Sequence, residues 1–178
     1  MTTSTSPAPI LRTERLILSG HTLADFDECL AMWADPHVTV HIGGRPSTEE
    51  EVWARVLRYA GMWALLGYSY WLVRERESGR MVGEVGLADF HRDVTPPLGA
   101  PEAGWVLATW AHGRGFATEA VRAALSWADA QLAAPRTVCM IAPANTASIR
   151  VAEKCGFRES LRTTYKGDDS VIYERLRV

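Results

Sequence analysis

A glycine-rich junction between a predicted strand and a predicted helix, residues 110–120, constrains the fold of this chain more than any other feature. The apolar run 104–108 before it predicts a strand, and the apolar spacing over 118–132 predicts a helix. Such a turn presents free backbone N–H groups at the positive end of the helix dipole, which suits phosphate binding. Gly113 and Gly115 have no Cβ, so a ligand can approach the backbone closely. The junction therefore predicts a phosphate-binding turn, with an ordinary strand-ending turn as the alternative.

Two common phosphate-binding motifs do not fit this junction. The dinucleotide motif Gly-x-Gly-x-x-Gly would need a glycine where Thr118 stands, and the P-loop motif Gly-x-x-x-x-Gly-Lys-(Ser/Thr) is absent. The junction instead resembles the acyl-CoA pyrophosphate loop of the GNAT family of N-acetyltransferases, (Gln/Arg)-x-x-Gly-x-(Gly/Ala). The matching residues are His112, Gly113, Arg114, Gly115, Phe116 and Ala117, and Thr118, Glu119 and Ala120 continue the match as in the RimJ/RimL-like branch. His112 stands where Gln or Arg is usual, and we expect the loop to tolerate it because this position mostly supplies backbone.

Two further segments carry the same resemblance. Residues 11–18 are similar to the opening Leu-x-Thr-x-Arg-Leu-x-Leu of RimJ/RimL-type acetyltransferases. Residues 145–157 resemble the family's Asn-x-x-Ser-x-x-x-x-x-Lys-x-Gly-Phe run. The predicted order of elements also matches the N-acetyltransferase fold from about Leu11 onward.

The resemblance implies how an acetyl-CoA cosubstrate would bind. The strand before the glycine loop would be splayed from its neighbour, and its backbone around Val106 and Leu107 would pair with the pantetheine arm. The amides of residues 113–118 would take the pyrophosphate. The side chains of Val106 and Leu107 are expected to lie in the core in either case.

The second half of the resemblance assigns roles to four more residues, each with a structural alternative. Asn145 would bond the pantetheine, or would simply cap a helix. Ser148 would protonate the leaving thiolate, or would be a helix-surface hydroxyl. Arg150 and Lys154 lie four apart on one helical face and would meet the CoA phosphates, or would be solvated.

Acyl transfer to an amine needs a group that removes the amine proton and a donor for the oxyanion. A backbone N–H on the splayed strand can serve as the donor. Candidate bases are Glu84 on the preceding strand and Glu102 at the head of the cofactor strand, and His41 and His91 are weaker candidates. The alternative for each carboxylate is a surface or structural charge. No metal is expected, because the histidines do not cluster and the cysteines lack metal-ligand spacing.

Several tryptophans lie near the predicted gap in sequence. We expect most of them to be core residues and one or two to line an amine pocket. They are Trp53, Trp63, Trp71, Trp105 and Trp110.

The whole chain predicts a disordered tail over residues 1–9 and a single domain over 10–178. The domain is predicted to be α/β (α+β), with a mixed, mostly antiparallel sheet flanked by helices in the order β-α-α-β-β-β-α-β-α-β-β. The predicted strands are 10–19, 68–74, 81–90, 103–109, 137–141, 157–165 and 171–177, and the predicted helices are 23–34, one ending at Gly67, 118–132 and 146–154. Ser47 and Glu50 are predicted to form the capping box of the helix that ends at Gly67.

Composition narrows the possible partners and the cellular location of the protein. The formal net charge of −2 argues weakly against a nucleic-acid partner and weakly for cationic, amine-bearing substrates. Cys29, Cys139 and Cys155 are odd in number and lack Cys-x-x-Cys spacing, which fits a reducing, cytoplasmic location. No apolar run is long enough to span a membrane. The family resemblance adds a homodimer as one expectation.

Together these features predict an acetyl-CoA-dependent N-acetyltransferase of the RimJ/RimL-like branch. Its acceptor would be a primary amine, either of a small molecule or at a protein N-terminus. Thr164 precedes Tyr165 where some ribosomal-protein members carry a carboxylate, which argues against a ribosomal-protein substrate. The alternatives are a non-catalytic acyl-CoA-binding or sensing domain, and an interaction domain that binds no CoA.

Overall fold

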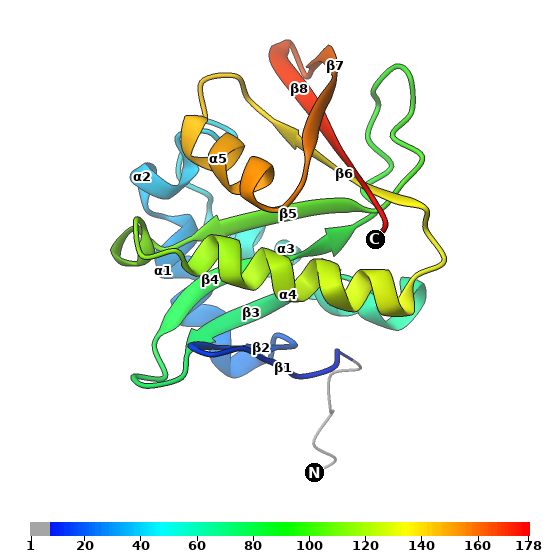
Figure 1. Ribbon diagram of the computed structural model, residues 1–178. Coiled ribbons are helices and arrows are strands. Elements are labelled where there is room, and N and C mark those ends of the chain that lie inside the picture. The colour runs from blue at the N-terminus through cyan, green and yellow to red at the C-terminus, as the bar shows by residue number, and fades with distance from the viewer. Residues whose placement is uncertain (1–7) are drawn as a thin grey trace.

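The computed structural model describes residues 8–178, which form one eight-stranded sheet with helices on both faces (Figure 1). The strand order is β1-β2-β3-β4-β5-β6-β8-β7, and all neighbouring strands are antiparallel except β5 and β6. This confirms the predicted α/β (α+β) class and the mixed, mostly antiparallel sheet. The strands are β1 (Leu11–Arg12), β2 (Leu16–Ser19), β3 (Tyr70–Glu75), β4 (Met81–Ala88), β5 (Glu102–Leu107), β6 (Arg136–Ile141), β7 (Arg158–Tyr165) and β8 (Asp168–Leu176).

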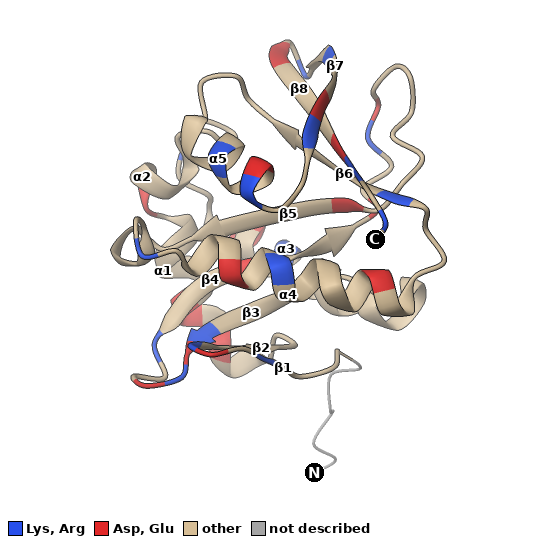
Figure 2. Cartoon of the chain, viewed as in Figure 1, with Lys and Arg blue, Asp and Glu red and all other residues tan. Residues whose placement is uncertain are grey.

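Helices cover the two faces of this sheet (Figure 1). The helices are α1 (Phe26–Trp33), α2 (Pro36–Thr39), α3 (Glu49–Leu66), α4 (Phe116–Gln131) and α5 (Thr146–Lys154), with the short 3-10 helices η1 (Leu23–Asp25) and η2 (Thr109–Ala111). Charges of both signs lie along α4 (Figure 2), in keeping with the small formal net charge of −2. None of the helices within residues 8–178 is both long and apolar enough to cross a membrane.

The helices on both sides of the sheet follow the predicted amphipathic spacing. On α4 the buried residues recur every three to four positions, which places one apolar stripe on the sheet. On α3 the buried stripe has the same period and packs on the opposite side. The buried side chains are Phe116, Ala120, Val121, Ala124, Leu125 and Ala128 on α4, and Val52, Val56, Tyr59 and Trp63 on α3.

The predicted first strand, residues 10–19, is wrong as a single element. It is a small antiparallel hairpin, because a turn closed by Thr13 N–H to the Leu16 carbonyl at 3.0 Å separates β1 from β2. The segment after α1 contains the short helix α2, which is not among the predicted helices. Asp35 caps α2 by accepting a hydrogen bond from the N–H of His37 at 2.8 Å, and Pro36 stands at its first position, where its missing N–H has no cost.

The predicted capping box of α3 is wrong by one residue. Thr48 rather than Ser47 is the N-cap, and the side chain of Glu51 accepts from the Thr48 N–H at 2.8 Å. The sequence contains two overlapping boxes, one starting at each residue. An ion pair between Arg45 and Glu51 at 2.5 Å adds to the second box, and this contact depends on the path of the loop before the helix.

The predicted disordered tail, residues 1–9, lies mostly outside the described residues, since the structure describes none of residues 1–7. The last two residues of that segment are held by the fold. Ala8 is buried, and the carbonyl of Pro9 accepts a hydrogen bond from Trp71 Nε1 at 2.8 Å. Trp71 is a fully buried side chain of β3, so its indole N–H needs a partner, and the chain entering β1 supplies it.

Glu119 joins two segments that the sequence shows far apart. Its carboxylate, in the first turn of α4, accepts from the Thr13 hydroxyl at 2.6 Å, the Arg15 N–H at 2.9 Å and Arg15 Nε at 2.7 Å. Arg15 also donates to the carbonyl of Arg114 at 2.9 Å. The Thr-x-Arg of the opening motif and the glutamate after the glycine loop are therefore one hydrogen-bonded unit that fixes the start of α4 against the β1–β2 hairpin.

We expect Glu119→Gln to lower the free energy of unfolding by about 2 kcal/mol near neutral pH, because charge-assisted hydrogen bonds are lost. Burial alone would raise the pKa of Glu119, but the bonds from Thr13 and Arg15 outweigh it and lower the pKa. A carboxyl group with a lowered pKa stabilises the fold at higher pH, and this contribution fades as pH falls through the folded-state pKa. Urea unfolding at several pH values should therefore show the gap between the two proteins shrinking toward acid. A constant gap would contradict this account.

Candidate active site

The sheet opens between its two parallel strands. β5 pairs with β4 along its whole length, from Glu102↔Ala88 to Leu107↔Gly83. With β6 it pairs only at Glu102↔Val138. Beyond that pair the two strands diverge, so the other edge of β5 has no strand partner within the described chain.

A cleft of about 920 Å³ occupies the place where the strands diverge. Its floor includes residues 102–106 of β5 and 139–142 at the end of β6. Its walls come from α3 and the loop before it, from residues 89–92 after β4, and from the β7–β8 turn. The cleft thus places the free edge of β5 beside a space large enough for a small molecule.

The glycine loop lies at the C-terminal end of β5 and leads directly into α4. Gly113 and Gly115 have φ of 74° and 79°, a left-handed conformation that residues with a Cβ rarely adopt. Gly115 is the N-cap of α4 and has no side chain to bond the first amides of the helix, residues 116–118. These N–H groups are therefore left for a ligand, as an anion-binding helix start requires.

Basic and aromatic side chains surround this loop. The guanidinium of Arg114 lies 4.6 Å from the ring centroid of Phe116 and pairs with Glu75 at 2.9 Å. His112 places Nε2 3.0 Å from the carbonyl of Leu107, so its ring ties the loop to the end of β5. The unusual residue of the motif therefore has a positioning contact of its own. Phe116 is buried in the core, and Ala117 and Thr118 are half-buried.

The structure places two of the four predicted residues of the second motif at the cleft. Asn145 is the N-cap of α5, and its side-chain oxygen accepts from the N–H of Ser148 at 3.1 Å. Both residues line the cleft across from β5. Arg150 and Lys154 lie on the exposed face of α5, outside the cleft, where no acidic partner lies within 4.0 Å in the described chain. The capping role of Asn145 is thus established by geometry, whatever it binds besides.

Of the two predicted carboxylates, Glu102 lies in the wall of the cleft. Arg92 donates to both of its oxygens, from Nε at 2.6 Å and from a terminal nitrogen at 2.7 Å. Burial would lower the pKa of Arg92, but this bidentate contact raises it, so the guanidinium stays charged. Glu102 therefore faces the cleft with its hydrogen-bonding capacity already taken up by a permanent cation.

Glu84 lies behind the cleft wall and is completely buried. It accepts from Trp33 Nε1 at 3.0 Å, and its other oxygen lies 3.2 Å from His21 Nε2. Burial opposes its charge, yet these contacts and the field of Arg55 lower its pKa. Glu84 pairs with Val106 on the neighbouring strand, so it lies beside the part of β5 that the family resemblance assigns to the cofactor.

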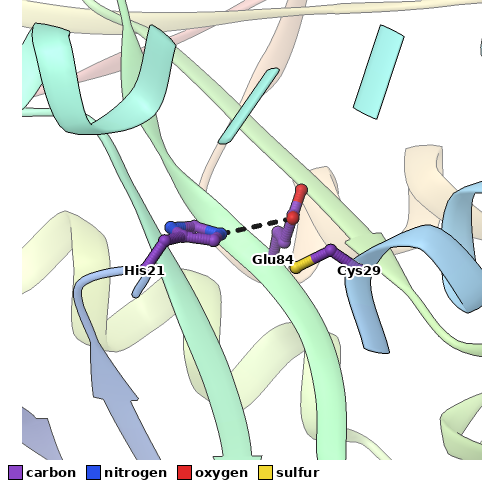
Figure 3. Close-up of side chains that lie close together, drawn as sticks. All are labelled: His21, Cys29 and Glu84. Carbon is purple, nitrogen blue, oxygen red and sulfur yellow. Dashed lines mark hydrogen bonds and ion pairs between the residues drawn. The ribbon is translucent and has the colours of Figure 1, made fainter. Parts of the chain in front are cut away.

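His21, Glu84 and Cys29 form a buried cluster whose donor atoms lie within 4.8 Å of one another (Figure 3). These three types of side chain can hold a metal ion. Burial, followed by the charge of Glu84, raises the pKa of the Cys29 thiol, which opposes the thiolate that a metal would need. Both oxygens of Glu84 are also already engaged. The geometry therefore describes a hydrogen-bonded core cluster around Glu84.

The tryptophans lie in different environments, and Trp53 is 41% exposed and lies outside both the core and the cleft. Trp63, Trp71 and Trp127 pack edge to face, with ring centroids 4.8 to 5.5 Å apart, as core residues. Trp105 lines the cleft, as expected for one member of the predicted set, and Trp33 lines it without having been predicted. Sequence analysis had no means of choosing them, because the space that each tryptophan faces depends on how α1 and β5 pack in the folded chain.

Sequence analysis also missed the polar wall that α3 contributes. Arg55, Arg58 and Tyr59 all line the cleft. The signal was present as a basic, polar stripe on a predicted amphipathic helix, but such a stripe normally faces solvent. Which space it faces is decided by the packing of α3 on the sheet.

Comparisons with known proteins agree with this architecture. The family model of the acetyltransferase (GNAT) domain matches residues 15–158. A structure of a GNAT-family acetyltransferase from Bordetella pertussis superposes with a TM-score of 0.82 at 33% identity, covering 94% of this chain and 99% of that one. The chain belongs to the GNAT family, and it is an acyltransferase.

Relatives known from their sequences are more divergent. An uncharacterized N-acetyltransferase, p20, from Bacillus licheniformis is 27% identical over 88% of this chain and 86% of its own length. The uncharacterized protein YkkB of Bacillus subtilis is 30% identical over 61% of this chain, and the match spans 62% of that relative's length. Structures of a spermidine N-acetyltransferase from Vibrio cholerae and of RimL, both with CoA, are 17% identical with TM-scores of 0.73 and 0.77, which shows a shared fold.

Proposed function

We propose that this protein is an acetyl-CoA-dependent N-acetyltransferase that transfers acetyl directly to the primary amine of a small molecule. One observation carries the proposal. The unpaired edge of β5 runs along a cleft and ends at a glycine loop whose first helical amides have no side-chain cap. A pantetheine arm has the amide groups that such a strand edge pairs with, and its pyrophosphate has the charge that such a helix start binds.

In the proposed complex, the backbone at Val106 and Leu107 pairs with the pantetheine, and the amides of residues 113–118 bind the pyrophosphate. Asn145 faces the arm from the start of α5, and Arg150 and Lys154 reach the CoA phosphates from outside the cleft. The spermidine N-acetyltransferase and RimL structures contain CoA, which supports this choice of cosubstrate. The three motifs also support the RimJ/RimL-like branch.

The amine must lose a proton as it attacks the thioester. We propose that this proton leaves through water to Glu84, because Glu84 lies opposite Val106 in the sheet register and its lowered pKa keeps it ionised. Glu102 is the second candidate; like those of Glu84, both of its oxygens already accept hydrogen bonds within the protein. Ser148, on the cleft wall, protonates the departing thiolate. A backbone N–H of β5 stabilises the oxyanion.

The lining of the cleft favours a small acceptor over a protein N-terminus. Six aromatic side chains line it, Trp33, Tyr59, Tyr70, Phe90, Trp105 and Tyr165. Its lining is mixed in charge and is not the acidic groove expected for a peptide amine, because five basic side chains accompany its five carboxylates. The carboxylates are Glu51, Asp89, Glu102, Asp168 and Asp169, and the basic residues are Arg45, Arg55, Arg58, Arg92 and Lys166. Three cysteines that are free and buried fit the proposed cytoplasmic location.

Release of free thiol from acetyl-CoA tests the proposal. The panel should contain free amino acids, polyamines, aminoglycosides and short peptides, with an amine-free blank. We expect release above the blank with one class of small amine. Binding of acetyl-CoA with no release on any amine would instead support the sensing domain, which the comparisons do not favour.

Glu84→Gln should lower kcat by about a hundredfold and remove the acidic limb of the pH profile of kcat/KM, since the proton acceptor is lost. The effect on KM for acetyl-CoA should be small. Glu102→Gln is the matched comparison, because it also removes one negative charge from the site. If Glu102→Gln abolishes the acidic limb while Glu84→Gln retains it, Glu102 rather than Glu84 is the proton acceptor.

Ser148→Ala should lower kcat by about tenfold or more at unchanged KM for both substrates, because the leaving thiolate loses its proton donor. The backbone N–H of Ser148 still bonds Asn145, so the helix start survives the change. Thr146→Ala, an exposed hydroxyl in the same turn, is the control. Equal kcat values for the two variants would remove Ser148 from the mechanism.

A further inference from the structure

The cleft contains two arginines that have no carboxylate partner. Arg55 and Arg58 project from successive turns of α3, and within residues 8–178 neither has a carboxylate oxygen within 4.0 Å. Two other cleft arginines are neutralised, Arg45 by Glu51 at 2.5 Å and Arg92 by Glu102 at 2.6 Å. The α3 wall of the cleft therefore carries two arginines that form no ion pair in the described chain.

The packing around Arg55 holds its guanidinium in a fixed position. Its central carbon, Cζ, lies over Trp33, 3.6 Å from the ring centroid, and Arg55 is half-buried. Its Nε is buried and has no hydrogen-bond partner among the described residues. A stacked guanidinium presents its donors edge-on, which is the geometry that recognises a planar or tetrahedral oxyanion.

Arg58 lies one turn further along the same face. It is exposed, and its guanidinium lies 5.2 Å from the ring centroid of Phe90, a residue of the opposite cleft wall. Like charges three or four residues apart on a helix repel each other. A bound anion between them would relieve this repulsion.

The buried carboxylate of Glu84 does not form an ion pair with Arg55 or Arg58. Glu84 interacts electrostatically with Arg55, but its oxygens are engaged by His21 and Trp33. It also lies behind the lining, whereas both arginines reach the cleft. Asp89, Asp168 and Asp169 also line the cleft, but none of them forms an ion pair with Arg55 or Arg58 in the described chain. An anion that binds both arginines would therefore enter through the cleft.

We propose, resting on the proposed function, that the acceptor is an amine that also carries an anionic group, a carboxylate or a phosphate, which Arg55 and Arg58 bind. The amine of such an acceptor points toward the thioester at β5 while its anionic end is held at α3. A wholly cationic acceptor, such as a polyamine, places positive charge against both guanidinium groups and is rejected. The arginines thus determine which amines enter productively.

Matched acceptors that differ only in the anionic group test this assignment. Initial rates of thiol release are compared for an amino acid and its amide, for phosphoethanolamine and ethanolamine, and for spermidine. We expect the anionic member of one pair to exceed its neutral match by about tenfold or more in kcat/KM. The responding pair distinguishes carboxylate from phosphate. Equal rates within both pairs, or a preference for spermidine, would overturn the proposal.

Variants of Arg55 and Arg58 test whether these two residues cause the preference for an anionic acceptor. Arg58→Gln and Arg55→Gln should each reduce the ratio within the responding pair, chiefly through KM for the anionic acceptor, with little change for the neutral one. Arg45→Gln, which removes a cleft cation already neutralised by Glu51, should keep the ratio. A ratio unchanged in Arg58→Gln and Arg55→Gln would contradict the assignment.

A binding measurement separates this inference from the proposed function. Calorimetry on the CoA-loaded protein compares N-acetylglycine with N-acetylglycinamide, and N-acetylphosphoethanolamine with N-acetylethanolamine. Tighter binding of an anionic probe, lost in Arg58→Gln, supports the arginine site even where no amine is acetylated and the proposed function fails. Equal binding within both pairs, alongside clear acetylation of a neutral amine, would refute the arginine site and leave the proposed function standing.

Discussion

Gly86→Ala should lower the free energy of unfolding by about 3 kcal/mol or more, because backbone occupies the space that its side chain would need. A Cβ at Gly86 would lie 2.3 Å from the Tyr70 Cα and 2.4 Å from the Ser69 carbonyl oxygen. Neither atom can move without separating β3 from β4 at the centre of the sheet. Urea unfolding followed by tryptophan fluorescence measures the loss.

Gly61→Ala is the control for this prediction. Gly61 lies within α3, and a Cβ there would meet nothing within 4 Å. Because alanine favours helix over glycine by about 1 kcal/mol, this variant should be neutral or slightly more stable. If the two variants have equal stabilities, the close approach of β3 to Gly86 is wrong.

Gly115→Val is predicted to weaken acetyl-CoA binding by about a hundredfold, the largest expected effect on the proposed function. Its φ of 79° is strained for a β-branched residue, so the loop must rearrange or carry strain. Rearrangement moves the amides that would bind the pyrophosphate and forfeits several hydrogen bonds to a charged group. Calorimetric titration with acetyl-CoA gives the affinity directly.

Gly79→Val offers a matched control for the strain. Gly79 has a similar φ of 69°, has open space around it, and lies in the β3–β4 turn away from the cleft. Both variants should lose comparable stability, but Gly79→Val should keep its affinity for acetyl-CoA. Equal affinities in the two variants would show that the glycine loop does not bind the cofactor.

Local features were the ones that sequence analysis predicted well. The glycine loop, the helix that follows it and the short helix Thr146–Lys154 depend on neighbouring residues, and the structure reproduces them within about two residues at each end. The end of α5 is also determined by residues that are close in sequence. The N–H of Phe157 bonds the Ala152 carbonyl at 3.0 Å, and Gly156 adopts φ of 89°, as a glycine after a helix allows.

Sequence analysis did not predict the contacts between segments that are distant in the chain. The opening motif and the glycine-loop motif were recognised separately, but the bonds from Thr13 and Arg15 to Glu119 cross more than a hundred residues. Glu84 was singled out by its place on a strand, yet its burial and its partners His21 and Trp33 come from α1 and the segment before it. Such pairings depend on how distant elements pack together, and they cannot be inferred from a single sequence.

The net charge of the chain does not describe how charges are distributed within the cleft. The formal charge of −2 favoured cationic acceptors at the level of the whole chain. Two carboxylates of the cleft lining, Glu51 and Glu102, pair with arginines, while Arg55 and Arg58 form no ion pair within residues 8–178. This arrangement on α3 is the basis of our proposal that the acceptor carries an anionic group beside its amine, a feature that net charge does not predict.

Transfer of an isotopically labelled acetyl group from acetyl-CoA to an amine tests the central claim most directly. Wild-type protein, Gly115→Val and an enzyme-free blank are incubated with labelled acetyl-CoA and the amines, and products are identified by mass spectrometry. We expect labelled N-acetyl product in a one-to-one ratio with free CoA for the wild type, and far less for the variant. Bound acetyl-CoA that remains intact, or free CoA without an acetylated amine, would contradict it.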